Sequence, residues 1–320
     1  MRSCRIVGTG GYLPEQRISN SDVEQRCDTS DEWIRSRSGV TQRFICEEQE
    51  GTADMAVAAA QKALEDANLT ASDIDLVIVG THYPDYATPS TACQVQATLG
   101  ITGPAYDLNA ACSGFVYGID NAWRQIATGA AETALVIGAD RLSQVIQWDD
   151  RATAVLFGDG AGAAILQASG TDNGIKYSKL YADGSLKDVV FITNGNQPPG
   201  TEHEENRIYM RGNELFRHAV TVLSSSLKTA LEDTGKTINE IDWLIPHQAN
   251  IRIMNAVAKK VGLPQDKVIV TVDQHANTSA ATIPLALDLA RRDGRIKAGD
   301  TVAFAAVAGG LAWGVTLLEM

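Results

Sequence analysis

The stretch that organises the chain is Asp107-Leu108-Asn109-Ala110-Ala111-Cys112-Ser113-Gly114-Phe115, where a strand should give way to a helix. Residues 104–108 predict the strand, and residues 115–123 predict the helix. Cys112 would therefore lie at a helix N-terminus, where unpaired backbone N–H groups and the helix dipole favour the nucleophilic thiolate. Small neighbouring side chains would let a substrate carbonyl approach. The alternative is a buried cysteine that packs as a small hydrophobic side chain.

Composition limits the class of protein. The chain has 320 residues and is 44% hydrophobic, which is enough for more than one core and suggests two halves. The net charge of −12 argues against general nucleic-acid binding. No apolar run approaches the roughly 18 residues of a membrane span, and residues 1–8 read as a first strand rather than a targeting signal.

The cysteines indicate a reducing compartment. The chain has five of them, an odd number without CxxC spacing, so the sequence predicts neither a disulfide framework nor a zinc site. A cytoplasmic location is therefore expected. These cysteines are Cys4, Cys27, Cys46, Cys93 and Cys112.

Helices and strands alternate along the first half. Helical patterns cover residues 52–68 and 91–99, and short apolar strands cover residues 74–80 and 134–138. Such alternation predicts an α/β fold built from βαβ units with a parallel sheet. Residues 158–162 lack the spacing of a nucleotide-binding loop, and we expect them to form a structural hairpin.

The chain then repeats itself. The sequence Ala-Leu-Glu-Asp occurs at 63–66 and again at 230–233, and the strand that starts at Ile74 recurs at Ile241. Both intervals are 167 residues, and the same offset relates Cys112 to Ser279. A duplicated α/β half explains this pattern, the alternative being two unrelated helix–strand pairs. We expect halves at 1–170 and 171–320, followed early in the second by a long polar connection at 183–206.

The second half supplies further polar groups at the ends of predicted strands. A strand at 241–245 leads to His247 and a helix at 251–261, and a strand at 267–272 leads to Asn277. Open α/β sheets place their sites at such carboxyl ends, so a pseudo-twofold axis would bring these residues to Cys112. A structural histidine and a helix N-cap are the alternatives for the two side chains. His275 is expected to have no catalytic role.

Three motifs in this order resemble a known family. They are Asp-Leu-Asn-Ala-Ala-Cys-Ser-Gly-Phe at 107–115, Pro-His-Gln-Ala-Asn at 246–250 and Ala-Asn-Thr-Ser-Ala-Ala at 276–281. They look like the active-site motifs of β-ketoacyl-acyl carrier protein synthase III, the condensing enzyme that initiates type II fatty acid synthesis. The likeness extends to residues 30–34, 157–163 and 308–314. It implies a thiolase-like α/β fold, in which two pseudo-twofold-related halves form a layered α-β-α-β-α core.

The resemblance also implies a mechanism. Cys112 would take an acyl group from acyl-CoA, with acetyl-CoA as the expected primer, and malonyl-acyl carrier protein would then lose CO2 and condense with it. His247 Nε2 and the Asn277 amide would donate hydrogen bonds to the enolate, and the backbone N–H groups of Cys112 and Gly309 would hold the second oxyanion. The resemblance implies no metal, flavin or nicotinamide. Acyl-CoA is a substrate of the reaction and not a cofactor.

Further residues receive roles from the same resemblance. Trp33, Arg37, Arg151 and Asn250 match positions that contact coenzyme A. A carrier-protein docking face is expected at Arg217, Arg252, Lys259 and Lys260. The acyl pocket is expected to include Thr88 and Phe157, and the enzyme to be a homodimer. Thr88 replaces a common phenylalanine, which suggests room for longer or branched primers. Val307 and Ala308 also depart from the family's usual Phe and Gly.

Rival functions remain. A condensing enzyme or acyltransferase of secondary metabolism would use the same fold and the same cysteine. A non-catalytic acyl-CoA-binding module is a rival from another class, although it would have no use for a nucleophile. Thiolase is disfavoured because the chain has no cysteine after Cys112.

Overall fold

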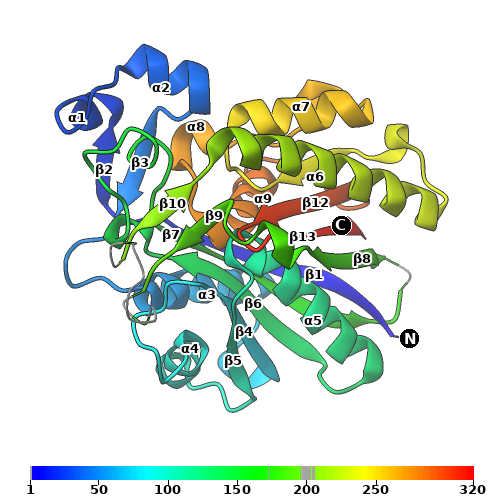
Figure 1. The fold of residues 1–320 in the computed structure, drawn as a ribbon. Coiled ribbons are helices and arrows are strands. Elements are labelled where there is room, and N and C mark those ends of the chain that lie inside the picture. The colour runs from blue at the N-terminus through cyan, green and yellow to red at the C-terminus, as the bar shows by residue number, and fades with distance from the viewer. Residues whose placement is uncertain (1, 172, 195, 197–202, 204–205) are drawn as a thin grey trace.

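Two mixed β-sheets lie at the centre of the molecule (Figure 1). The computed structural model describes residues 2–171, 173–194, 196, 203 and 206–320. Among these residues the first sheet has the strand order β1-β7-β6-β4-β5 and the second has the order β11-β12-β13-β8. The strands of the first sheet are β1 (Ser3–Tyr12), β4 (Leu76–Gly80), β5 (Ala105–Leu108), β6 (Thr133–Asp140) and β7 (Gly160–Ser169). Those of the second are β8 (Gly174–Ala182), β11 (Trp243–Pro246), β12 (Thr301–Ala308) and β13 (Ala312–Glu319).

Helices cover the sheets in layers. Two helices, α5 and α9, pack between the sheets, α3 and α4 pack on the outer face of the first sheet, and α6 packs on the second sheet with α7 beside it. The bounds are α3 (Thr52–Ala67), α4 (Thr91–Leu99), α5 (Gly114–Thr128), α6 (Gly212–Thr234), α7 (Ile251–Val261) and α9 (Thr282–Arg292). The predicted layered α-β-α-β-α core is therefore confirmed, as are the predicted helices at 52–68, 91–99 and 251–261.

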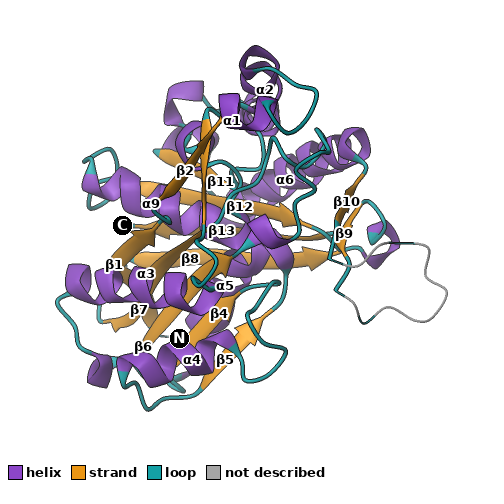
Figure 2. Ribbon diagram, turned by 90° about the vertical axis from the view of Figure 1, so that its left-hand side faces the viewer, coloured by secondary structure: helices purple, strands orange, loops and turns teal. Residues whose placement is uncertain are grey.

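Smaller elements flank this core. The pair β9 (Val190–Ile192) and β10 (Ile208–Met210) lies to one side of the molecule in Figure 2, apart from α1 and α2. The others are α1 (Asn20–Glu24), α2 (Asp31–Ser38), α8 (Val272–His275), and the paired strands β2 (Gln16–Ser19) and β3 (Gln42–Ile45). The connection predicted at 183–206 thus contains β9, and its residues 195, 197–202 and 204–205 lie outside the described part of the chain.

Strand direction corrects the prediction of a parallel sheet. β4 is parallel to β5 and β6, and β11 is parallel to β12, as expected for βαβ units. However, β7 is antiparallel to β6 and β1, and β13 is antiparallel to β12 and β8. The reason is connectivity: no α-helix lies between β6 and β7 or between β12 and β13, and a parallel pair needs such a crossover.

Two local predictions were wrong. Among the described residues, 267–272 form no strand: the short turn Gln265–Lys267 ends at the first of them, a single bridge joins Val268 to Leu244, and α8 begins at Val272. Residues 158–162 form no hairpin, because the backbone before Gly160 makes turns and β7 begins there. Apolar side chains were misread in both places: they belong to irregular backbone segments that are buried without forming a strand.

The structure also shifts the predicted repeat by one residue at the critical turn. The interval is 167 residues from the turn Ala71–Asp73 to Ile238–Glu240, but 168 from the turn Ala111–Ser113 to Ser279–Ala281. Ser279 therefore corresponds to Ala111 rather than to Cys112. Both residues have positive φ, 46° at Ala111 and 56° at Ser279, so the two turns share one backbone shape.

Glycines let these turns approach the first sheet. A Cβ on Gly80, at the end of β4, would lie 2.5 Å from the carbonyl carbon of Gly114. A Cβ on Gly138, in β6, would lie 2.2 Å from the carbonyl oxygen of Ala280. Only glycine permits such contacts, so the turns that hold Cys112 and Ser279 lie directly on the sheet and against each other.

Candidate active site

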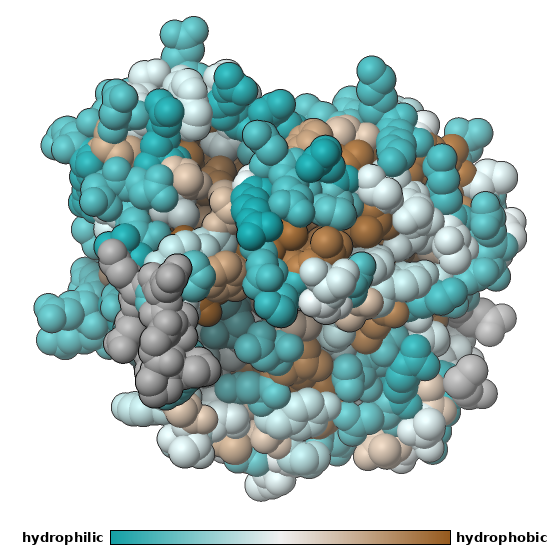
Figure 3. All heavy atoms as spheres, in the orientation of Figure 1, coloured by the Kyte–Doolittle hydropathy of each residue, from teal (hydrophilic) through white to brown (hydrophobic). Residues whose placement is uncertain are grey.

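One cavity of about 670 Å³ brings together residues from distant parts of the chain. Cys112, His247 and Asn277 all line it, although they follow three different strands or loops. Apolar parts of the other wall come from β9, β10, the start of α6 and the loop that includes Leu142 and residues 155–157. Figure 3 shows apolar side chains gathered beneath α6 on this face of the molecule. The cavity therefore suits a partly apolar substrate that reacts at its inner polar end.

Cys112 lies in the short turn Ala111–Ser113, immediately before α5. Its Sγ accepts a hydrogen bond from Ser279 Oγ at 3.5 Å. Burial raises the pKa of the thiol to about 11, and the Ser279 hydrogen bond offsets only part of that rise. The net direction is opposite to the one expected from the helix N-terminus, because desolvation of the thiolate outweighs the local N–H groups. The resting group is therefore a thiol.

His247 follows β11 and is 4% exposed. Its backbone N–H donates to Ala305 O at 2.8 Å, which continues the ladder with β12, and its Nδ1 lies 2.7 Å from Thr282 Oγ1. Burial lowers its pKa to about 3, so the imidazole is neutral near neutral pH. Of its two ring nitrogens, Nδ1 is thus paired with Thr282, which leaves Nε2 for a substrate.

The Thr282 hydroxyl governs the His247 tautomer. Its oxygen also lies 2.9 Å from Ser279 O, and it has one hydrogen to donate. If the hydrogen points to Ser279 O, Nδ1 carries the ring proton and Nε2 is an acceptor. If it points to Nδ1, Nε2 carries the proton and is a donor. Rotation of this hydroxyl therefore switches the chemistry that His247 offers.

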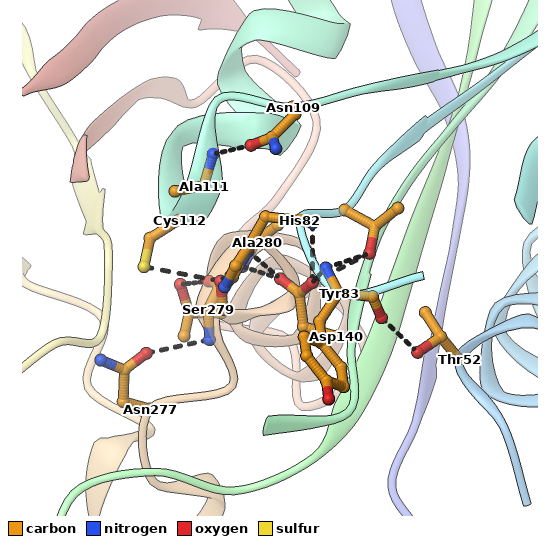
Figure 4. Close-up of polar contacts among 12 residues, drawn as sticks. Thr52, His82, Tyr83, Asn109, Ala111, Cys112, Asp140, Asn277, Ser279 and Ala280 are labelled. Atoms are coloured by element: carbon orange, nitrogen blue, oxygen red, sulfur yellow. Dashed lines mark hydrogen bonds and ion pairs between the residues drawn. The ribbon is translucent and has the colours of Figure 1, made fainter. Parts of the chain in front are cut away.

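Asn277 is held by its side-chain oxygen, so the neighbouring backbone does not use its NH2 group. Its Oδ1 accepts from Ser279 N at 2.9 Å, and its own backbone N–H donates to Leu156 O at 2.9 Å. In Figure 4 the nitrogen of the Asn277 amide points away from Ser279. The local hydrogen bond resembles the capping role that was the alternative for this residue, but it uses only the oxygen.

The sequence interpretation missed a polar pair beside the cysteine. His82 follows β4, Asp140 ends β6, and His82 Nδ1 lies 3.0 Å from Asp140 Oδ2. Ser279 Oγ contacts both His82 Nδ1, at 3.4 Å, and Cys112 Sγ. The signal was present: both residues follow predicted strands, and the rule that singled out His247 applies to them equally.

The predicted coenzyme A residues also line the cavity. The guanidinium carbon of Arg151 lies 4.7 Å from the centroid of the Trp33 ring, and that of Arg37 lies 6.0 Å from it. Asn250 lines the cavity too, but its side chain caps α7 by accepting from Arg252 N and donates to Arg37 O. A cation-flanked aromatic ring can stack on a nucleobase, whereas Asn250 is engaged in local structure.

The remaining predicted residues divide between the cavity and the surface. Phe157 and Gly309 line the cavity, and Phe157 pairs with Asn277 through an isolated bridge. Thr88 is exposed and is not part of the cavity wall in this chain. The predicted docking residues are exposed on α6 and α7, and of these only Arg252 lines the cavity. They are Arg217, Arg252, Lys259 and Lys260.

Neither a metal-ligand cluster nor a membrane-spanning helix is found among the described residues. No three His, Cys, Asp or Glu side chains gather closely enough there to hold a metal ion. None of the helices in that part of the chain is both long and apolar enough to cross a membrane.

Comparisons with known proteins give one consistent family. Residues 106–184 match the model described as 3-Oxoacyl-[acyl-carrier-protein (ACP)] synthase III, and residues 231–320 match that family's C-terminal model. The chain is 48% identical over 321 residues to the β-ketoacyl-[acyl-carrier-protein] synthase III of Rhizorhabdus wittichii, with 100% of both chains covered.

Solved structures agree. The crystal structure of 3-oxoacyl-[acyl-carrier-protein] synthase III from Aquifex aeolicus is similar with a TM-score of 0.94 at 43% identity, covering 99% of this chain and 100% of that one. That of the synthase III from Thermus thermophilus is similar with a TM-score of 0.95 at 40% identity, covering 99% of each chain.

Proposed function

The chain belongs to the 3-oxoacyl-[acyl-carrier-protein] synthase III family, and from that premise we propose that Cys112, His247 and Asn277 carry out its reaction. It is an initiating condensing enzyme of fatty acid synthesis, and an acyltransferase. The observation that supports the assignment of roles is the convergence of these three side chains in one cavity from separate turns. A nucleophile beside two potential hydrogen-bond donors suits acyl transfer followed by enolate chemistry.

The first step is acylation of Cys112. Its Sγ attacks the thioester carbonyl of an acyl-CoA, with acetyl-CoA as the expected primer. A new S–C bond forms, the bond to the coenzyme A sulfur breaks, and coenzyme A leaves with the thiol proton. In the later condensation step, the backbone N–H groups of Cys112 and Gly309 hold the oxyanion that forms on the acyl carbonyl. Trp33, Arg37 and Arg151 hold the nucleotide end, with Asn250 organising the wall between them.

The second step is decarboxylative condensation. Malonyl-acyl carrier protein loses CO2, and the resulting enolate attacks the acyl carbon so that Cys112 leaves as a thiolate. The enolate oxygen accepts hydrogen bonds from Asn277 Nδ2 and His247 Nε2. Asn277 is suited to this because its Oδ1 is already bound to Ser279 N. The step requires no metal, flavin or nicotinamide, since the charge remains on an oxygen between two donors.

Intact-protein mass tests this proposal. The native protein should gain one acyl group from acetyl-CoA and lose it as a β-ketoacyl product when malonyl-acyl carrier protein is added. Acylation without that condensation would favour the acyltransferase rival, and absence of acylation by any primer would contradict the mechanism. A panel with butyryl- and octanoyl-CoA measures the preferred primer length in the same experiment. A strict acetyl preference would contradict the expectation, drawn from Thr88 in place of the family's common phenylalanine, that longer primers are accepted.

Thr282 gives a prediction about the His247 tautomer. For His247 Nε2 to donate, Nδ1 must accept the Thr282 hydroxyl hydrogen. Thr282→Val removes that hydrogen and keeps the shape, so kcat for condensation should fall about tenfold, the size of one net hydrogen bond, with KM little changed. Thr282→Ser keeps the hydroxyl and should retain most activity. Equal kcat values for the two variants would show that Nε2–H does not act as a donor.

We further propose that the acyl carrier protein docks on the exposed basic face of Arg217, Arg252, Lys259 and Lys260. On a chain with net charge −12, a local basic face is needed to attract an acidic partner. Lys259→Glu should raise KM for malonyl-acyl carrier protein about tenfold and make it less sensitive to salt. Acylation by acetyl-CoA should not change, because Lys259 does not line the cavity. Lys297→Glu is the matched control; an equal effect there would refute a local dock.

The assembly and the compartment are also proposals. We infer a homodimer from membership of the family, whose enzymes the sequence resemblance leads us to expect as dimers. We infer a cytoplasmic location, supported by five cysteines that are all free. We also infer that the halves are 1–170 and 171–320, since the strands of each large sheet come from one half alone.

A further inference from the structure

A buried ion pair lies beside the proposed nucleophile. The side chains of His82 and Asp140 are 10% and 0% exposed, and His82 Nδ1 lies 3.0 Å from Asp140 Oδ2. The other carboxylate oxygen of Asp140 accepts hydrogen bonds from Thr81 Oγ1 at 2.9 Å and from the backbone N–H groups of His82 and Tyr83 at 3.0 and 3.2 Å. These donors stabilise the carboxylate, so a negative charge is fixed at the end of β6.

Each member of the pair favours the ionised form of the other. Burial alone would lower the pKa of His82, but the Asp140 carboxylate outweighs it and the net direction is upward. Burial alone would raise the pKa of Asp140, but His82 and the local hydrogen bonds lower it. The two shifts agree, because each charge is stable only while the other is present.

The pair is connected to Cys112 through Ser279. Ser279 Oγ lies 3.4 Å from His82 Nδ1 and 3.5 Å from Cys112 Sγ, and the series of contacts can be followed in Figure 4. The Nδ1–H of His82 points to the nearer Asp140 oxygen. The Ser279 hydroxyl donates to Cys112 Sγ, although Ser279 also interacts with the Asp140 carboxylate. Ser279 N donates to Asn277 Oδ1, so the same residue also contacts the third member of the site.

The Asp140 charge opposes the chemistry of its neighbour. Cys112 must become an anion to attack, and the Asp140 carboxylate by itself raises the pKa of the thiol. We propose that His82 is a positioning residue for the reaction: its imidazolium offsets the Asp140 charge and keeps the Ser279 hydroxyl directed at Cys112. This inference rests on the proposed nucleophilic role of Cys112 and adds a residue to it.

Other charged groups do not replace His82. From the second sheet, His247 faces the cavity as a neutral imidazole and contributes no charge. Among the described residues, four cations line the cavity: Arg37 on α2, Arg151 in the loop before β7, Lys187 in the loop before β9, and Arg252 on α7. Of these elements, none supplies a cation with a contact to Asp140 or Ser279, whereas His82 contacts both.

Alkylation of Cys112 by iodoacetamide tests the inference, followed by the mass of the Cys112 peptide across a pH series. His82→Asn keeps a hydrogen-bonding side chain but removes the charge, so the Cys112 pKa should rise by about one unit and alkylation at about pH 8 should be about tenfold slower. The double variant His82→Asn with Asp140→Asn removes both charges and should recover to within about threefold of native. His218→Asn, on the exposed face of α6, is the matched control and should match native.

Two outcomes would overturn the inference. One is a folded His82→Asn variant, verified by thermal unfolding, that alkylates as fast as native. The other is equal slowing in His82→Asn and in the double variant, which would indicate a packing effect. If His82→Asn does not fold, the single variant Asp140→Asn tests the inference instead. It should be alkylated near the native rate, and marked slowing would contradict the electrostatic role of the pair. Alkylation needs no acyl-CoA, so its result is separate from failure of the proposed reaction.

Discussion

Cys112→Ser should abolish acylation by acetyl-CoA and lower the condensation rate by at least about 10⁴-fold. The replacement is nearly isosteric and can still accept the hydrogen bond from Ser279 Oγ. It fails because a buried hydroxyl ionises far less readily than a thiol whose pKa is about 11. Intact mass after incubation with acetyl-CoA, together with product formation from malonyl-acyl carrier protein, measures both losses.

The control for this experiment is Cys93→Ser on α4. Cys93 is also a free, partly buried cysteine, and its Sγ donates a hydrogen bond to Ala105 O at 3.6 Å. That variant should acylate at the native rate, because it lies outside the cavity. Acylation of the Cys112→Ser protein, or loss of acylation in Cys93→Ser, would place the nucleophile elsewhere and would contradict the proposed reaction.

The native protein should also show a pH signature. Because the pKa of Cys112 is raised above its usual value, the thiolate fraction keeps increasing with pH across the neutral and mildly alkaline range. If attack of the thiolate on the thioester limits acylation, the acylation rate should therefore increase with pH. It should not level off near the pKa of an ordinary thiol. His247, whose pKa is about 3, stays neutral in this range, so its protonation does not lower the acylation rate there.

Asn277→Asp should separate the two steps. The carboxylate keeps an oxygen for Ser279 N, but it has no N–H to donate and places a negative charge where the enolate forms. Loss of one donor of this kind costs about 10²- to 10³-fold in rate, and the added charge should increase that loss. Acylation of Cys112 by acetyl-CoA should slow far less, by at most about tenfold, because Asn277 acts only on the enolate and the new charge affects acylation only through the pKa of Cys112. Single-turnover acylation and steady-state condensation measure the two steps separately.

A matched substitution distinguishes this effect from a general charge effect. Asn213 also lines the cavity, near the start of α6, and Asn213→Asp adds the same charge away from Cys112. It should change the condensation rate by less than about tenfold. Equal losses in both aspartate variants, or loss of acylation in Asn277→Asp, would show that Asn277 is not the specific donor for the enolate.

Much of the fold followed from the chain because periodicity and repetition are local signals. The helices at 52–68 and 251–261 appeared from apolar spacing, and the repeat indicated two related sheets with helices around them. Predictions were wrong where apolar residues of a loop are buried, as at 267–272. They were also wrong where a strand pairs without a helical crossover, as for β7. Burial is a property of the whole molecule, so a short apolar run does not distinguish a strand from a covered loop.

By itself, the sequence determined which groups are proposed to react: a cysteine at a strand-to-helix turn, and a histidine and an asparagine in the second half. Tertiary structure alone decided their states. Burial makes Cys112 a high-pKa thiol and His247 a neutral imidazole, and the one-residue shift in the repeat places Ser279 between Cys112 and the His82–Asp140 pair. The reason is physical: residue type and spacing are written locally, whereas desolvation and charge at a site come from side chains up to 197 residues apart, as for His82 and Ser279.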